Sequence, residues 1–232
     1  NKYRKLGFLN AKTTVTTSKV VDSVKKSRVD MLVRIDRGQK IKVKTITFDG
    51  TGKLSAKQLR KSMKNTKQKN IFRVLKRSKY IEADYKEDLQ SVVDKYKEKG
   101  FRDARVITDS VFLNTKKTKL AINVKVEEGR RYYFGNIKFL GNSVYSDQLL
   151  GRVLGIKKGD LYNKDLFTQR LFGGPDGRDI TGLYMNKGYL FFQVIPVETN
   201  VTNNHINHQI RIIEGKIATN GTITIRGNTK TN

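Results

Sequence analysis

The chain of 232 residues contains no cysteine and no tryptophan, and it has only two prolines and two histidines. The absence of cysteine excludes disulfides, thiolate zinc sites, iron–sulfur clusters and cysteine nucleophiles. No stretch approaches the ~20 consecutive apolar residues that a membrane-spanning helix needs. Apolar residues make up 37% of the chain, and its length predicts one or two domains at ~100–200 residues each.

Positive charge is in excess, because 48 Lys and Arg stand against 21 Asp and Glu, a formal net charge of +27. This charge favours attraction to phosphates, anionic lipid or an acidic protein without choosing among them. Between Lys53 and Lys79 there are 11 basic residues and no acidic one. A nucleic-acid surface would interleave aromatic residues for base stacking, but this run contains only Phe72. We therefore expect a solvated surface, or contact with phospholipid headgroups or an acidic protein, and no nucleic acid. The candidate basic surface comprises Lys57, Arg60, Lys61, Lys64, Lys67, Lys69, Arg73, Lys76 and Arg77.

Three short patterns recur in the same order along the chain. The first is a tyrosine followed, after three residues, by glycine and an aromatic residue. The second is a strand end closed by glycine, and the third is an alternating strand followed by glycine. Successive copies lie 86 to 93 residues apart, and such regular spacing predicts a tandem repeat. The first pattern begins at Tyr3, Tyr96 and Tyr184, the second closes at Gly38, Gly129 and Gly215, and the third ends at Gly50, Gly141 and Gly227.

The patterns predict how the chain divides. We expect the C-terminal part of one repeat at 1–38, complete repeats at 39–129 and 130–215, and the first strand of a further repeat at 216–232. In the strands that precede the closing glycines, alternate positions are expected to face inward. These positions are Val29, Met31, Val33 and Ile35 in the first copy, Leu120, Ile122, Val124 and Val126 in the second, and Ile206, His208, Ile210 and Ile212 in the third.

Each complete repeat is predicted to have the element order β-α-α-β-β. In the first, a strand over 42–48 precedes a helix that Ser55 begins with a capping-box spacing. A second helix from about Tyr85 to Lys99 ends at Gly100, and strands follow over 104–113 and 119–127. In the second repeat, glycines and a proline at 173–177 interrupt the second helix and predict a loop.

The connections constrain the sheet. Two antiparallel helices bring the chain back to the face it left, and the second and third strands form a hairpin, so the strand order is 1-3-2. The strict alternation of the last strand indicates that one face of the sheet is covered and the other is wet. The second strand is then an edge. Pro196 lies in that strand of the second repeat, which agrees with an edge position. The expected fold class is α+β, with a three-stranded mixed sheet and two helices in each repeat.

These repeated patterns resemble POTRA domains, the polypeptide-transport-associated modules of outer-membrane assembly proteins. The resemblance covers nearly the whole chain and rests on the order of the patterns more than on any single one. It is carried by Tyr96–Phe101 and Tyr184–Tyr189, by the Glu-Gly closures at Gly129 and Gly215, and by the Gly-Asn pairs at Gly141 and Gly227. Two features depart from the pattern: Arg37 precedes the closing Gly38, and the loop at 173–177 is long.

The resemblance implies a role and partners. It implies a periplasmic module, tethered to the outer membrane of a diderm bacterium through a C-terminal β-barrel. The module would receive unfolded outer-membrane proteins and accessory lipoproteins and deliver substrates to that barrel. It implies no cofactor and no catalysis. Anionic lipid headgroups are a further candidate partner, through the basic surface.

The main candidate site is the edge strand of the first complete repeat. Its unpaired backbone N–H and C=O groups can accept an extended peptide as an added strand, whatever the peptide's side chains are. Pro196 removes one donor from the matching strand of the second repeat, so augmentation is expected to be weaker there. The candidate residues are Arg105, Val106, Ile107, Thr108, Asp109, Ser110 and Val111.

The sequence offers no catalytic set or metal site. His205 and His208 lie three residues apart on a strand and are expected on opposite faces. The strand-closing carboxylates Glu127, Glu128 and Glu214 are interpreted as turn or salt-bridge residues. Two other interpretations stay open at this point: a basic nucleic-acid-binding repeat protein, and the POTRA region of a related secretion, translocation or cell-division protein.

Overall fold

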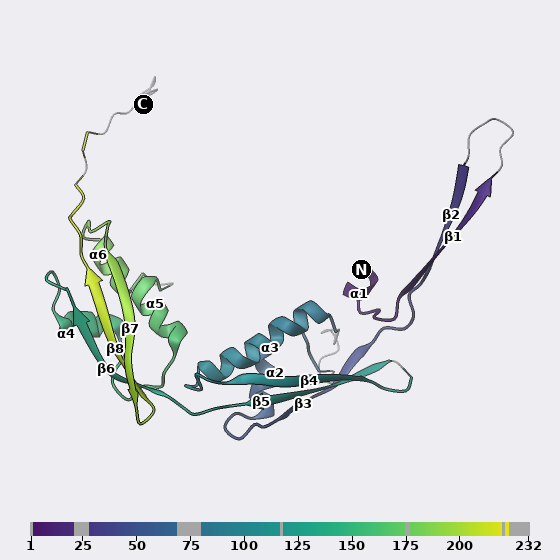
Figure 1. The fold of residues 1–232 in the computed structure, drawn as a ribbon, viewed down its shortest axis with the longest axis horizontal. Coiled ribbons are helices and arrows are strands. Elements are labelled where there is room, and N and C mark those ends of the chain that lie inside the picture. Colours follow the sequence, from purple (N-terminus) through teal and green to yellow (C-terminus); the bar gives the residue numbers. More distant parts are fainter. Residues whose placement is uncertain are drawn as a thin grey trace, which may run out of the picture. The chain divides into compact units, whose positions relative to one another are not determined.

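The computed structural model describes residues 2–20, 28–68, 80–116, 118–174, 177–219 and 221–222. By contacts, the chain divides into two compact units. The first unit comprises Asn1–Tyr96 and Asp103–Glu128, and the second comprises Lys97–Arg102 and Gly129–Asn232. Within the described ranges the strands form three separate sheets, one with two strands and two with three strands (Figure 1).

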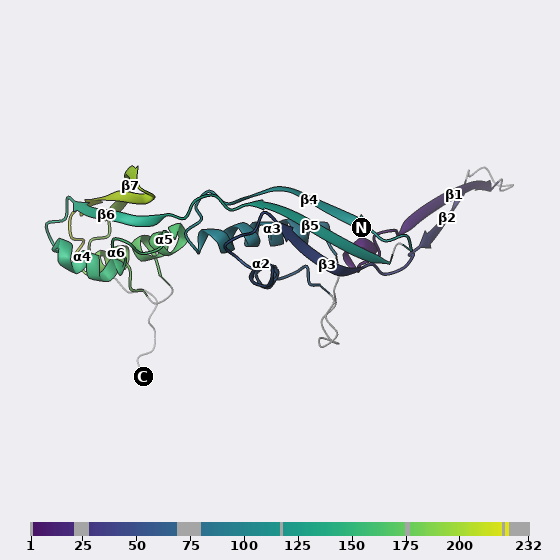
Figure 2. The same cartoon turned by 90° about the horizontal axis from the view of Figure 1, so that it is seen from below.

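The sheet of the first complete repeat has the predicted strand order. It is built from β3 (Lys42–Asp49), β4 (Arg105–Leu113) and β5 (Lys119–Glu127) in the order β3-β5-β4. β3 pairs with β5 in parallel and β4 pairs with β5 in antiparallel fashion, as Figure 2 shows by placing β5 between its neighbours. All four inward positions of β5 are buried, which confirms the predicted register.

Two helices complete this repeat, α2 (Ala56–Ser62) and α3 (Glu82–Lys97). The predicted capping box is present at the start of α2. The Gln58 N–H donates to the Ser55 hydroxyl (3.3 Å), and the Ser55 N–H donates to the Gln58 side chain (2.9 Å). α3 begins three residues before the predicted start and buries Tyr85, Val92 and Tyr96 on one stripe.

The buried stripe of α3 also contains Asp88, which has no exposed surface. Its carboxylate accepts the backbone N–H groups of Lys64 (2.6 Å) and Asn65 (3.0 Å) and that of Thr66. A carboxylate that receives three backbone donors compensates for its own burial. Asp88 therefore holds the segment that leaves α2 against α3.

The second complete repeat has the same sheet with different helices. β6 (Tyr133–Leu140), β7 (Gln193–Thr202) and β8 (His205–Ile213) are arranged in the order β6-β8-β7. The helices are α4 (Asp147–Leu154), α5 (Lys164–Phe172) and α6 (Ile180–Met185). The second helix expected here is thus two helices, α5 and α6, separated by the predicted interruption.

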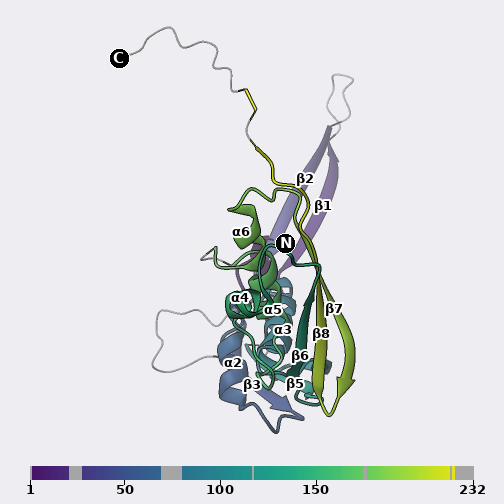
Figure 3. The same ribbon diagram turned by 90° about the vertical axis from the view of Figure 1, so that its left-hand side faces the viewer.

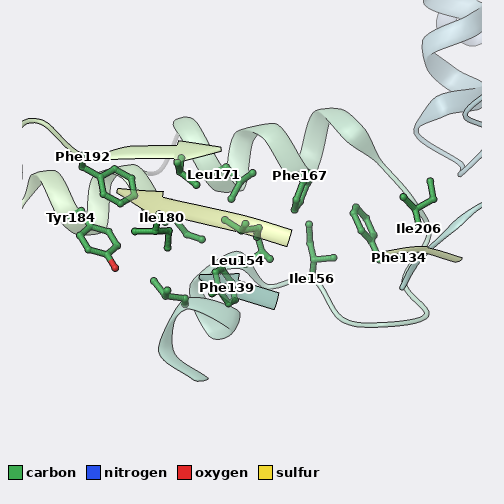
Figure 4. Packing of buried hydrophobic residues seen from close by; sticks show 14 of the residues in the cluster. Phe134, Phe139, Leu154, Ile156, Phe167, Leu171, Ile180, Tyr184, Phe192 and Ile206 are labelled. Carbon is green, nitrogen blue, oxygen red and sulfur yellow. The ribbon is translucent and has the colours of Figure 1, made fainter. Parts of the chain in front are cut away.

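The core of this repeat lies between the helices and one face of the sheet (Figure 4). Tyr184 of α6 stacks on Phe192 with ring centroids 4.2 Å apart, and Phe134 contacts Phe167 at 5.5 Å. Ile206, His208, Ile210 and Ile212 are all buried, which confirms the register predicted for the third copy.

The N-terminal hairpin is formed by β1 (Lys12–Val20) and β2 (Arg28–Asp36), after the short helix α1 (Lys2–Lys5). The inward burial expected for its last strand is wrong in this structure. Val29, Met31, Val33 and Ile35 lie on one face, as the register requires, but 45–66% of their surface is exposed. The reason is that β2 pairs only with β1 and that no helix among the described residues packs on this hairpin. The strand expected at 223–225 lies outside the described residues.

Candidate functional site

The three repeated patterns meet at one point in each complete repeat. In the first, the Tyr96 hydroxyl donates to the Glu128 carboxylate (3.0 Å), which also accepts the backbone N–H groups of Lys53 (2.9 Å) and Leu54 (3.3 Å). In the second, Glu214 accepts the Tyr184 hydroxyl (3.0 Å) and the N–H groups of Ser143 and Val144. The glutamate therefore joins the end of the second helix to the loop after the first strand.

The glycine of the third pattern is required by the same arrangement. Gly50 has φ +78°, and a Cβ atom there would lie 2.1 Å from the Val126 carbonyl oxygen. Gly141 has φ +87°, and its Cβ would lie 2.2 Å from the Ile212 carbonyl oxygen. Each loop thus passes too close to the closing strand for any side chain. The repeated residues are explained by this packing, and Glu128 and Glu214 have the turn role expected from the sequence.

The electrostatics of these glutamates follow from their hydrogen bonds. Burial alone would raise the pKa of Glu128, but the N–H groups of residues 52–54 and the Tyr96 hydroxyl outweigh burial and lower it below its ordinary value. The pKa of Glu214 is lowered against burial in the same way, by Ser143, Val144 and Tyr184. Burial and the neighbouring carboxylate raise the pKa of each tyrosine. Both pairs therefore consist of an ionised glutamate and a protonated tyrosine near neutral pH.

The candidate edge strand lies where it was predicted. Among the strands that the structure describes, β4 pairs with β5 on one side only, so along its other side alternate backbone groups have no partner strand. The ladder has a β-bulge between Val106 and Thr108, which leaves Ile107 as an extra residue. A bulge interrupts regular pairing. The regular part of β4 therefore extends from Thr108 to Leu113, further toward the hairpin tip than the candidate range of 105–111.

The regular part of β4 carries an unusual number of exposed apolar side chains. Val111 (37% exposed) and Leu113 (43%) lie opposite buried residues of β5, and Phe112 (60%) lies on the other face. On the helix-facing side, Asp109 lies beside the N-terminal end of α3. Burial first, and then the Asp109 carboxylate, raise the pKa of Tyr85. The Tyr85 ring packs against Tyr80 with centroids 5.4 Å apart, so two tyrosines flank this strand.

The matching edge strand of the second repeat is less regular. β7 contains Pro196, opposite Ile210, and a bulge between Glu198 and Asn200. Glu198 is itself engaged, because its carboxylate accepts the Tyr162 hydroxyl (2.8 Å) and forms an ion pair with Arg102 (2.7 Å). These features reduce the length of free, uniform edge on β7.

The candidate basic surface is only partly described. Lys57, Lys61 and Lys64 are exposed, whereas Arg60 donates to the Ile46 carbonyl (3.1 Å) and Lys67 donates to the Met63 carbonyl. Lys69, Arg73, Lys76 and Arg77 lie outside the described residues. The described part therefore offers three cations to a partner, while two others hold the backbone.

The two histidines are on opposite faces of β8, as predicted. His205 stacks on Tyr133 at a centroid distance of 5.5 Å. His208 is 3% exposed and lies among the rings of Phe134, Tyr162 and Phe167. Over the described ranges, no three His, Asp or Glu side chains are grouped as a metal site would require.

Sequence reasoning missed three of these features. The Asp88 contacts join residues 22 to 24 positions apart, and an aspartate on an apolar stripe gives no indication of its partners. The bulge at Ile107 has no glycine or other marker. Tyr85 is buried on the stripe of α3 as expected, but its position beside the edge strand depends on where α3 crosses the sheet.

Comparison with known proteins places this fold in a class. The POTRA family, described as a surface antigen variable number repeat, matches residues 41–129 and 132–215. The chain belongs to the POTRA family. No helix that the structure describes is both long and apolar enough to cross a membrane.

Within that class, the chain is similar to the outer membrane protein assembly factor BamA. It is 28% identical to BamA of Neisseria meningitidis serogroup B over 229 residues, which cover 97% of this chain and 27% of the relative. It is 24% identical to BamA of Buchnera aphidicola over 141 residues, covering 61% of this chain and 23% of the relative. The chain thus spans about a quarter of these relatives. The crystal structure of Haemophilus influenzae BamA POTRA3-5 superposes with a TM-score of 0.51 at 21% identity, covering 83% of this chain and 73% of that one.

Proposed function

We propose that this chain is a periplasmic scaffold of the outer-membrane assembly machinery. In this role it binds unfolded outer-membrane proteins and accessory lipoproteins and passes the substrates to the membrane-embedded part of the machinery. The similarity to BamA supports this role, and so does the tandem arrangement of the repeats. The four segments are proposed to be the C-terminal part of one POTRA domain (1–38), two complete domains (39–129 and 130–215) and the first strand of another (216–232).

The observation that carries the proposal is the free edge of β4. An unfolded outer-membrane protein consists of segments that will become β-strands, and such a segment can pair with β4 through its backbone alone. The exposed Val111, Phe112 and Leu113 would contact alternate side chains of the added strand. Tyr80, which is partly exposed, would border it on the helix-facing side, with the buried Tyr85 behind it. Recognition by the backbone accounts for a site that accepts many different sequences.

Native-state hydrogen exchange of the 232-residue chain tests this proposal directly. The probe is a ten-residue peptide with alternating apolar and polar residues, taken from a strand of an outer-membrane protein. We expect the peptide to raise protection at amides within 108–113, with a smaller effect on β7. A peptide of the same length with proline at every second position is the matched control, since it cannot form the ladder. Unchanged protection at 108–113 would contradict edge binding.

A further inference from the structure

In the described part of the second unit, one face of the sheet carries no helix. α4, α5 and α6 all lie on the other side of β6-β8-β7 (Figures 2 and 3). Strand alternation places Leu140, Ile195 and Ile213 on the open face, since their neighbours Phe139, Val194 and Ile212 are buried. Phe191, just before β7, extends this row of residues. It lies beside the end of β8, because a Cβ atom added to Gly215 would be 3.2 Å from the Cβ atom of Phe191.

These four residues, here called the open-face patch, are strongly exposed. The exposed fractions are 45% for Leu140, 71% for Phe191, 43% for Ile195 and 50% for Ile213. Single exposed apolar residues need no explanation, but a group of them on one surface marks an interaction site.

The first unit provides an internal control for this patch. The pair Gln193–Ile213 corresponds to Arg105–Glu127, and the pair Ile195–Arg211 corresponds to Thr108–Lys125. Three of the four patch positions carry acidic residues in the first unit: Leu140, Phe191 and Ile213 correspond to Asp49, Asp103 and Glu127. At the place of Ile195, the bulge of β4 sets both Ile107, which is 47% exposed, and Thr108 beside Lys125.

The polar residues of the first unit also satisfy one another. Glu127 forms an ion pair with Arg105 (2.6 Å), and Asp49 accepts a hydrogen bond from the Asn123 amide (2.9 Å). The same fold therefore accepts charged, paired side chains at these positions, and the exposed apolar residues of its open face lie on β4, at Ile107 and Phe112. The apolar residues of the second unit are not a requirement of the sheet, and their presence needs another cause.

A cation lies in the middle of the open-face patch. Arg211 is on β8 between Ile195 of β7 and Leu140 of β6. Its side chain is exposed and makes no ion pair or hydrogen bond within the described part of the chain. An unpaired guanidinium surrounded by apolar residues is complementary to a carboxylate that arrives with its own apolar neighbours.

We propose that the open face of β6-β8-β7 is a docking surface for an amphipathic α-helix of a partner protein. The helix would lay its apolar stripe on the open-face patch and place an Asp or Glu against Arg211. A helix is the favoured occupant because an apolar sheet face is buried by a helix or by a second sheet, and an isolated helix brings no unpaired strand edges. This surface is separate from the β4 edge, so it does not depend on the proposed function.

The experiment uses the 232-residue chain and two synthetic peptides. The first is an 18-residue amphipathic helix with leucine along one face and a single glutamate at the centre of that face. The second has lysine in place of the glutamate. We expect the glutamate peptide to bind in calorimetry and to shift the amide resonances of β6, β7 and β8, and the lysine peptide to bind at least tenfold more weakly.

Substitutions taken from the first unit locate the site. Ile213→Glu and Leu140→Asp introduce residues that the same fold already accepts, and each is expected to abolish binding with an unchanged melting temperature. Phe172→Glu is the matched control, since Phe172 is exposed to a similar extent (49%) but belongs to α5. It should leave binding intact.

Four results would overturn the proposal. They are failure of the glutamate peptide to bind, equal binding of the two peptides, and resonance shifts confined to the helices. The fourth is self-association or vesicle binding that Ile213→Glu abolishes, because the occupant would then be a second copy or a membrane.

Discussion

The hydroxyl of Tyr96 and the carboxylate of Glu128 are joined by a hydrogen bond of 3.0 Å across 32 positions of the sequence. Tyr184 and Glu214 form the same bond at the same length in the next repeat. In the two complete repeats, the bond explains why tyrosine, and not phenylalanine, begins the recurring pattern.

Tyr96→Phe should lower the free energy of unfolding of its repeat by ~1 kcal/mol, the usual net value of one hydrogen bond. Glu128→Gln should cost more at neutral pH and less in acid. The pKa of Glu128 is lowered in the folded state, so its contribution is fully present above the unfolded pKa of ~4.3 and is lost as the pH falls through the folded value. Urea unfolding between pH 3 and pH 7 measures this. A penalty for Glu128→Gln that does not shrink in acid would contradict it.

Gly50→Ala should destabilise the first repeat by more than ~1–2 kcal/mol, the cost of a positive φ for a residue with a Cβ. The clash with the Val126 carbonyl adds to that cost. Gly151→Ala is the control, because Gly151 lies inside α4 with nothing near its Cβ position. There alanine should stabilise by ~0.5–1 kcal/mol. Thermal unfolding compares the two variants, and equal melting temperatures would refute the close-approach argument.

Asp88→Ala should release the segment that follows α2 from its hydrogen bonds to α3. Removal of the carboxylate leaves the N–H groups of Lys64, Asn65 and Thr66 without their acceptor, at ~1–3 kcal/mol for a buried unsatisfied group. We expect faster amide exchange at residues 64–66 and a lower melting temperature. Asp94→Ala on the same helix is the control, since Asp94 is not fully buried. Unchanged exchange at 64–66 would mean that the hydrogen bonds to Asp88 do not hold this segment in place.

His208→Ile should remove a pH dependence of stability between pH 5 and pH 8. Burial lowers the pKa of His208, although Glu198 opposes this shift. The unfolded chain then binds more protons, so the native repeat loses stability as the pH falls below the unfolded value of ~6.5. Isoleucine is the residue at the equivalent position, Ile122. Melting temperatures across this range test the prediction, and a slope that persists in the variant would assign it to another group.

Lys57 and Lys61, one helical turn apart on α2, should contribute to binding of anionic vesicles. At ~1 kcal/mol for each basic residue near such a surface, the double change to Gln should weaken binding by about 30-fold. Lys157→Gln with Lys164→Gln removes the same charge from the second unit and is the control. Sedimentation with phosphatidylglycerol vesicles measures both. Equal losses would show an effect of net charge and not of this surface.

Much of the fold could be predicted because it depends on local, repeated patterns. Ser55 and Gln58 are three positions apart, and the alternation of Leu120 to Val126 lies within one strand. Such patterns indicate element boundaries and faces directly. The strand order followed from connection rules and was confirmed in both complete repeats.

The remaining features depend on contacts that no local pattern encodes. The sequence marked Gly50 and Glu128 as repeated residues. It did not show that Glu128 accepts hydrogen bonds from the loop that follows Gly50, about 75 positions earlier in the chain. The exposed stripe from Val29 to Ile35 looks like a buried strand because alternation reports which face is apolar and not what covers it. The extra residue at Ile107 shifted the regular edge by several positions, and a bulge of this kind has no composition that reveals it.

One backbone hydrogen bond occurs three times and has a consequence for how these repeats can diverge. The N–H of the residue three positions after the closing glycine donates to the glycine carbonyl of the preceding turn. The pairs are Ile41 to Gly7 (3.0 Å), Tyr132 to Gly100 (2.8 Å) and Ala218 to Gly188 (2.8 Å). The donors have an aliphatic, an aromatic and a methyl side chain, so the bond is indifferent to what the residue carries. This bond excludes only proline from the three positions, and any further restriction comes from the packing of each side chain, as at the buried Ile41.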